Sequence, residues 1–138
     1  MKQVFVLINH TLTERQNLEL KRLYGSDCQL IFPPEEIKAY WAQIPPKPFI
    51  ESNKIQEIVT WLGKANNNDV LLVQGDFGAT FLIVDYALKN GLVPIQSVTK
   101  RIETEEYYGE KVYKHYVFEH ECFREYKSFS DTQEYQIV

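Results

Sequence analysis

The chain has 138 residues and a mass of 16.3 kDa, the size of one ordinary domain. Its 44% hydrophobic content, with 14% aromatic residues, excludes a disordered or low-complexity chain. The net charge of −4 argues against a general DNA or RNA binder, which neutralises phosphates with a positive face. No apolar run approaches the 18 residues of a membrane-spanning helix. We therefore expect a cytoplasmic protein without DNA or membrane partners, and any phosphate-bearing ligand to be small.

Hydrophobic periodicity divides the chain into alternating strands and helices. Apolar runs without a helical period predict buried strands, and apolar residues spaced three and four apart predict helices. In chain order we expect a strand at 3–8, a helix ending near 24, a strand at 27–32, helices at 35–41 and 52–62, a strand at 70–73, a helix at 80–89, a strand at 92–98 and a hairpin at 101–126. Thr11 or Thr13 is the expected cap of the first helix, and Gly25 its end.

This order predicts the fold class. It is an α/β fold, with a mostly parallel sheet flanked by helices and a C-terminal antiparallel β-hairpin that turns at 108–110. We expect residues 1–126 to form a single domain and residues 127–138 to form a loose tail.

Polar clusters follow three of the predicted strands. In an open parallel sheet, ligands bind beyond the carboxyl ends of the strands, where the strand order reverses. Topology would therefore bring these clusters together, although they lie far apart in the sequence. They consist of Asn9, His10 and Thr11 after the first strand, residues 74–80 after the third, and Thr99, Lys100 and Arg101 after the fourth.

The segment 74–80 is the most informative of the three. Gly75 and Gly78 allow tight turning and close backbone approach, and the helix that follows offers free N–H groups to an anion. The segment lacks the lysine of a phosphate-binding Walker loop and the three glycines of the dinucleotide fingerprint. An equally simple interpretation is a strand-to-helix turn with Asp76 as the helix cap.

Single residues suggest chemistry but leave alternatives open. His10 is a candidate general acid or base near neutral pH, or a hydrogen-bonded residue at the rim of a site. Lys100 and Arg101 are candidate phosphate ligands or solvated surface charges, and side-chain alternation allows only one of them to face a given ligand within a strand. Phe77 is a candidate for stacking on a base.

We find no sequence signal for a metal or another cofactor. The chain has no Cys-x-x-Cys and no His-Glu-x-x-His motif. Its two cysteines, Cys28 and Cys122, lie in predicted strands and are interpreted as buried small hydrophobic residues of a reducing compartment.

Four stretches together resemble a known family. They are Asn9-His10-Thr11-Leu12-Thr13, Trp41 with Ile44-Pro45-Pro46, the segment Gln74-Gly75-Asp76-Phe77-Gly78-Ala79-Thr80, and Gly91-Leu92-Val93-Pro94-Ile95 leading to Thr99-Lys100-Arg101. With these stretches the chain resembles a small CRISPR-associated family, the Csx family numbered twenty, an accessory of type III CRISPR systems. The similarity runs from residue 2 to about residue 126.

The resemblance implies a fold and an activity. The fold would be a compact relative of the Rossmann-like (CARF) domains that sense cyclic oligoadenylates, working as a homodimer. The activity would be that of a ring nuclease, which cleaves the second messenger cyclic tetraadenylate and switches off antiviral signalling. In that class the reaction needs no metal: a ribose 2′-hydroxyl attacks its own 3′-phosphodiester and leaves a 2′,3′-cyclic phosphate.

For that reaction we assign candidate site residues by their chemistry. The catalytic candidates are His10, Asp76, Lys100 and Arg101. The ligand-binding candidates are Asn9, Thr11, Gln74, Gly75, Phe77, Gly78, Ala79, Thr80 and Thr99. Two alternatives share these features: a sensor or sponge that binds the ring without cutting it, and a nucleotide-responsive protein that binds another protein through the hairpin.

Overall fold

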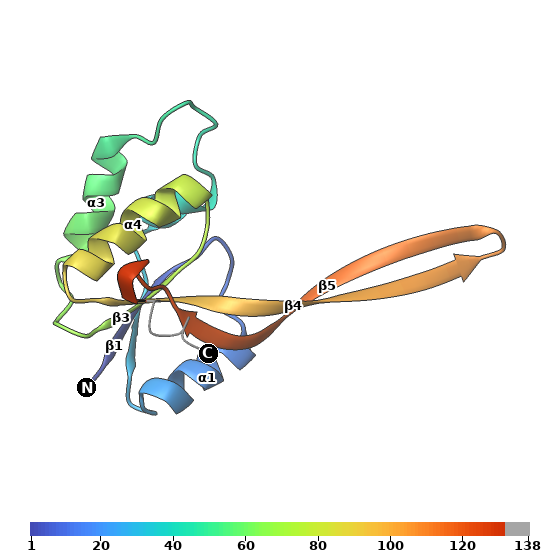
Figure 1. Cartoon of the computed structure of the whole chain (residues 1–138), viewed down its shortest axis with the longest axis horizontal. Coiled ribbons are helices and arrows are strands. Elements are labelled where there is room, and N and C mark those ends of the chain that lie inside the picture. The colour runs from blue at the N-terminus through green and yellow to red at the C-terminus, as the bar shows by residue number, and fades with distance from the viewer. Residues whose placement is uncertain (132–138) are drawn as a thin grey trace.

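The structure, a computed structural model, describes residues 1–131 and contains one five-stranded sheet against which helices pack (Figure 1). Its elements are β1 (Gln3–Leu7), α1 (Glu14–Tyr24), β2 (Gln29–Ile31), α2 (Glu35–Ala42), α3 (Ser52–Leu62), β3 (Val70–Val73), α4 (Phe77–Lys89), β4 (Val93–Tyr108) and β5 (Lys111–Glu125). The predicted α/β class with a C-terminal antiparallel hairpin is confirmed.

The strands lie in the order β2-β1-β3-β4-β5, with the first four parallel and β5 antiparallel to β4. From β1 the chain runs outward to β2 and then returns to the other side of β1 to form β3. The strand order therefore reverses between β1 and β3, where a parallel sheet forms its ligand crevice. The carboxyl ends of these two strands are tied together, since the backbone N–H of Gln74 donates to the carbonyl oxygen of Leu7 over 3.1 Å.

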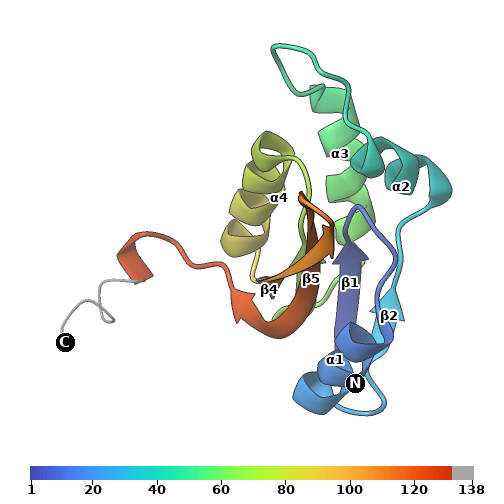
Figure 2. The same cartoon turned by 90° about the vertical axis from the view of Figure 1, so that its right-hand side faces the viewer.

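The two faces of the sheet bury separate apolar clusters. Helix α1 covers one face, and α2, α3 and α4 lie together over the other (Figures 1 and 2). Side chains alternate along β1, so Val4 and Val6 pack with Leu20 of α1, whereas Phe5 and Leu7 pack with Trp61 and the other helices. Short parallel strands that are apolar on both faces explain why the runs at 3–8 and 70–73 show no alternation.

Local capping chemistry fixes the start of α1. Thr13 accepts a hydrogen bond from the backbone N–H of Gln16, whose side chain bonds back to the N–H of Thr13, which completes a capping box. Gly25 ends the helix with φ of 107°, a conformation that favours glycine. These two predicted ends are confirmed.

Helix α4 begins one turn earlier than predicted. Asp76 accepts a hydrogen bond from the backbone N–H of Ala79, so the helix begins at Phe77 rather than Thr80. Glycine at position 78 lowers helix propensity, and for this reason the sequence did not predict the first turn of the helix. Residues 77–80 are therefore helical and not part of a loop.

The predicted fourth strand and hairpin also need correction. Strand β4 does not end at residue 98 but continues to Tyr108, where Gly109, with φ of 64°, forms the predicted turn into β5. Strand β3 pairs with β4 only as far as Ile95, so the outer part of β4 and β5 is a two-stranded ribbon that projects from the domain (Figure 1). Lys100 and Arg101 consequently lie within a strand and do not follow its end.

The two cysteines differ in environment. Cys28 is buried in the cluster under α1, as predicted. Cys122 is exposed on β5, so its interpretation as a buried residue is wrong: its neighbour Phe123 packs against the cluster under α1, and side chains alternate along a strand. Across residues 1–131, no helix has the length and the apolar character needed to cross a lipid bilayer.

Candidate functional site

One cavity at the carboxyl edge of the sheet lies against α4. This α4 cavity has a volume of about 770 Å³ and extends from the ends of β1 and β3 along α4 to the segment after β5. Five of the predicted ligand-binding residues line it: Asn9, Gln74, Gly75, Phe77 and Thr80. Residues 127–129, predicted to belong to a loose tail, also line it, whereas residues 132–138 lie outside the described part of the chain.

Aromatic side chains dominate the wall of the α4 cavity. Phe77 is 94% exposed and Phe81 is 70% exposed, which is unusual for side chains of this size. Tyr126 closes the far side, where its hydroxyl donates to the carbonyl oxygen of Val73 over 2.8 Å. Burial raises the pKa of the Tyr126 phenol above its ordinary value, and nearby Arg124 opposes the shift. The cavity thus combines apolar ring surfaces with the amides of Asn9 and Gln96.

The second cavity lies on the opposite face of the sheet, beside the N-terminus of α1. This α1 cavity has a volume of about 500 Å³. His10 and Thr99 are the predicted site residues that line it, together with Arg15 and His120. Thr11 lines a smaller hollow of about 80 Å³ that also includes His10.

Asn9 and His10 connect the two cavities. These consecutive residues follow β1 at the point where the strand order reverses, and both are exposed. Asn9 lines the α4 cavity, and His10 lines the α1 cavity. The end of β1 therefore lies between a cavity rich in aromatic rings and one lined by two imidazoles, the Arg15 guanidinium and the Glu119 carboxylate.

The backbone of the segment 74–76 is held from below by Trp41. The indole N–H of Trp41 donates to the carbonyl oxygen of Gln74 over 2.8 Å. A Cβ atom at position 75 would lie 2.6 Å from the same indole nitrogen, so only glycine fits there without movement of the tryptophan. The side chain of Gln74 is held as well, because it donates to the carbonyl oxygen of Ser97 and accepts from its N–H.

Asp76 acts as the N-terminal cap of α4. Its carboxylate accepts the N–H of Ala79 over 3.0 Å, and Asp76 lines neither of the two cavities. Ala79 is fully buried, so its side chain does not reach the cavity surface, and its N–H is already bonded. Gly78 is exposed but lines neither cavity.

Lys100 and Arg101 lie on the projecting ribbon. The Arg101 guanidinium stacks 4.7 Å from the centre of the Tyr116 ring, and Lys100 lies opposite Glu119 in the strand register. Neither residue lines any cavity described above. The structure of one chain therefore does not bring His10, Asp76, Lys100 and Arg101 into a single site.

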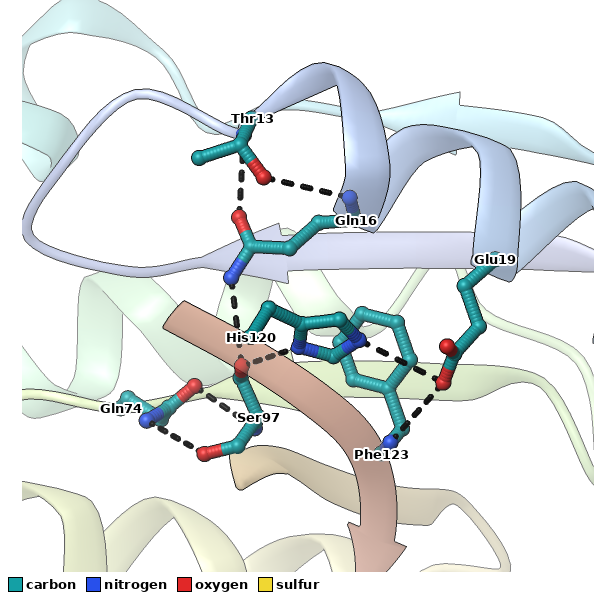
Figure 3. A network of polar contacts seen from close by, with 7 residues as sticks. All are labelled: Thr13, Gln16, Glu19, Gln74, Ser97, His120 and Phe123. Atoms are coloured by element: carbon teal, nitrogen blue, oxygen red, sulfur yellow. Dashed lines mark hydrogen bonds and ion pairs between the residues drawn. The ribbon is translucent and has the colours of Figure 1, made fainter. Parts of the chain in front are cut away.

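A buried polar network at the base of the hairpin was not predicted from the sequence (Figure 3). The hydroxyl of Ser97 lies 2.5 Å from Nδ1 of His120 and accepts a hydrogen bond from the side-chain amide of Gln16 over 3.3 Å. Nε2 of His120 lies 3.4 Å from a carboxylate oxygen of Glu19, within ion-pair range although without hydrogen-bond geometry. The same oxygen accepts the backbone N–H of Phe123.

This network fastens α1 to β4 and β5 at the place where the ribbon leaves the domain. Ser97 and His120 are both buried, so the serine hydroxyl is not placed to attack a bound molecule, although His120 forms part of the wall of the α1 cavity. Through the backbone of Ser97, the network also reaches Gln74 at the end of β3. A glutamine at the third helical position and a histidine on an inward-facing strand position were the signals available in the sequence.

Comparison with known families identifies the chain. Residues 2–124 match the model of a family described as "Uncharacterized protein MJ1673 family". The chain belongs to the MJ1673 family. A relative from Methanocaldococcus jannaschii, "Uncharacterized protein MJ1673", is 36% identical over 130 residues, which cover 94% of this chain and all of the relative. No solved structure matches the chain.

The MJ1673 family match extends over most of the candidate site. It includes β1, both cavity-lining residues that follow it, the α4 segment and the buried network, and it ends before Tyr126. Among residues 1–131 of this family member, no three His, Cys, Asp or Glu side chains are grouped so as to hold a metal ion.

Proposed function

We propose that this chain binds a cyclic oligoadenylate, cyclic tetraadenylate in the first instance, across the end of β1 and cleaves it as a ring nuclease. The observation that supports the proposal most is the position of Asn9 and His10. They line adjoining cavities of different chemistry at the reversal point of the sheet. Each nucleotide of a cyclic oligoadenylate carries an adenine base and a phosphodiester, so the ring needs a surface for base stacking next to a site for phosphate.

The α4 cavity suits the adenine bases. Aromatic rings such as Phe77 and Phe81 offer stacking surfaces, and stacking of a base on an aromatic side chain contributes about 1–3 kcal/mol. Asparagine and glutamine amides pair with adenine through its N6 and N7 atoms. Asn9 and Gln96 are the amides of this cavity that remain for such pairing, because Gln74 is bonded to Ser97.

The α1 cavity suits the phosphodiester. Arg15 provides a cation beside the N-terminus of α1, the positive end of the helix dipole, although the N–H of Gln16 is already bonded to Thr13. In the proposed step the ribose 2′-oxygen bonds to phosphorus, the bond from phosphorus to the 5′-oxygen breaks, and the 2′-proton passes to a base. His10 is the candidate base, and the departing 5′-oxygen takes a proton from solvent water. In-line placement of the two oxygens would itself lower the barrier by several kcal/mol.

Two finer expectations belong to the same proposal. The parallel order β2-β1-β3-β4 and its reversal beside β1 support a CARF-like, Rossmann-like domain. A homodimer would provide two copies of each cavity for a two-fold symmetric ring.

A second candidate is a sensor or sponge that binds the ring without cutting it. The position of three of the four predicted catalytic residues favours this alternative: Asp76 caps a helix, and Lys100 and Arg101 lie on the ribbon. Binding through the two cavities would then persist without turnover.

The test uses purified protein and cyclic tetraadenylate with EDTA present. We expect His10→Ala to lose cleavage by about 10²–10⁴-fold while it retains binding, and added imidazole to restore part of the rate. Arg15→Ala should weaken binding, whereas Arg22→Ala, at the other end of α1, serves as the matched control. If the wild type and the variants bind the ring but none of them cleaves it, the protein is a sponge or sensor. Full cleavage by His10→Ala would overturn its assigned role.

A further inference from the structure

The projecting ribbon has more exposed apolar surface than a free hairpin tolerates. We define the arm as residues 100–119, the part of β4 and β5 beyond the buried His120, with the turn between them. Within residues 1–131 it pairs with no third strand, because β3 bonds β4 only up to Ile95 (Figure 1). An isolated two-stranded ribbon is marginally stable in water, and both of its edges present unpaired backbone groups. The arm therefore requires a partner.

Both faces of the arm have apolar side chains. Residues paired across the two strands point to the same face. One face carries Ile102, Tyr108, Tyr113 and Val117, and the other carries Tyr107, Val112, Tyr116 and Phe118. Their exposed fractions reach 67% at Tyr107 and 66% at Phe118. Covering these rings would bury the kind of aromatic surface that anchors protein interfaces.

The charge of the arm indicates what kind of molecule covers it. Residues 100–119 contain four lysines or arginines and five glutamates, a net charge of −1. A nucleic acid or an anionic lipid surface would be repelled by this balance rather than attracted. A protein surface is the partner that fits.

The order of the charges along the arm indicates which protein covers it. On β4 the arm is basic at its base, with Lys100 and Arg101, and acidic toward its tip, with Glu105 and Glu106. Strand β5 has the reverse order, with Glu119 at the base and lysines toward the tip. About a two-fold axis, β4 of one arm lies against β4 of the other. Placed antiparallel in this way, the two arms set the basic base of each β4 against the acidic tip of the other, so that opposite charges meet. Placed parallel with β4 against β4, the same arms set like charges together.

We propose that the arm is a self-association surface, which pairs antiparallel with the arm of a second copy of this chain about a two-fold axis. Phe118 and Glu119 at the base of the arm also line the α1 cavity. The antiparallel arrangement therefore brings the tip of the partner's arm next to the mouth of that cavity. Any part that the partner's tip plays in ligand binding rests on the proposed function, whereas the association itself does not.

A charge exchange tests the proposal without ligand. The wild-type chain should have a solution mass of twice 16.3 kDa by light scattering and sedimentation. The variants K100E/R101E and E105K/E106K should each have the mass of one chain, because the base and the tip of β4 then carry the same sign in every arm. Mixed in equal amounts, the two variants should form a complex of two chains, since the base of each now complements the tip of the other.

The controls keep the outcome decisive. K54E/E57K exchanges an exposed ion pair on α3 and should leave the wild-type mass unchanged. Circular dichroism checks the fold, and the single reversals R101E and E105K replace any double variant that fails to fold. A wild-type mass of one chain, a persistent dimer in both reversed variants, or failure of the folded variants to associate when mixed would each overturn the proposal.

Discussion

The indole of Trp41 packs against Gly75 so closely that its nitrogen lies 2.6 Å from where a Cβ at that position would be. The same N–H donates to the carbonyl oxygen of Gln74 over 2.8 Å. A buried tryptophan of α2 thus sets the path of the chain between β3 and α4, and with it the position of Phe77 and Thr80 in the wall of the α4 cavity.

This contact predicts the effect of a single methyl group. Gly75→Ala should lower the free energy of unfolding by about 1–3 kcal/mol, because the methyl group forces the indole or the backbone to move. Gly78→Ala is the matched control: its Cβ would lie at least 3.5 Å from its neighbours, and alanine favours the helix, so stability should stay equal or rise by up to about 1 kcal/mol. Urea denaturation of both variants measures the difference. Equal stabilities would contradict the close packing.

Substitutions at Asp76 separate capping from catalysis. Asp76→Ala should destabilise the fold by about 0.5–2 kcal/mol, since the N–H of Ala79 loses its acceptor. Asp76→Asn keeps a capping oxygen and should retain both stability and any ring cleavage. If the carboxylate is instead a catalytic base, Asn at this position will reduce cleavage by about 10²–10⁴-fold while leaving stability intact. Unfolding curves and turnover rates of the same two preparations decide between these roles.

Asp76, which the sequence offered as either a helix cap or a site residue, shows how far local signals reach. Residue types and spacing predicted the strands, most helices and the polar residues at the ends of β1 and β3, because capping and hydrophobic periodicity are local. The order β2-β1-β3-β4 is a long-range property, which periodicity does not encode. Lys100 and Arg101 were placed at a strand end because Thr99 and the charges after it resemble a loop, whereas pairing with β5 continues the strand.

The buried network predicts a loss of stability from a conservative change. Ser97→Ala leaves Nδ1 of His120 and the side-chain amide of Gln16 without their buried partner, which should cost about 1–3 kcal/mol. Thr99→Ala, two residues along β4 and exposed, should change stability by less than about 0.5 kcal/mol. Chemical denaturation reports both values, and similar small changes in the two variants would show that the network contributes little. The residue types of Gln16 and His120 were signals in the sequence, but spacing does not show that they meet at Ser97, since α1 and the hairpin come together only in the fold.

Ionisation of Tyr126 should lower the free energy of unfolding at alkaline pH. Burial raises the pKa of its phenol above 10.0, the value expected for the unfolded chain. The folded state therefore holds the proton more tightly, so this contribution is complete below about pH 10 and is lost as the pH rises through the folded pKa. Tyr126→Phe should show a shallower decline of unfolding free energy above pH 10. It should also lose about 0.5–1.5 kcal/mol at neutral pH with the hydrogen bond to Val73. Identical alkaline slopes for the two proteins would contradict this explanation.

In the proposed function, the end of β1 joins the α4 cavity, which binds bases, to the α1 cavity, which binds phosphate. The most direct measurement is a multiple-turnover incubation of the wild-type protein with cyclic tetraadenylate in EDTA, with products resolved by liquid chromatography. We expect linear products ending in 2′,3′-cyclic phosphate, formed over many turnovers by the wild type and lost in His10→Ala. If the protein neither binds nor cleaves the ring, the claim is wrong.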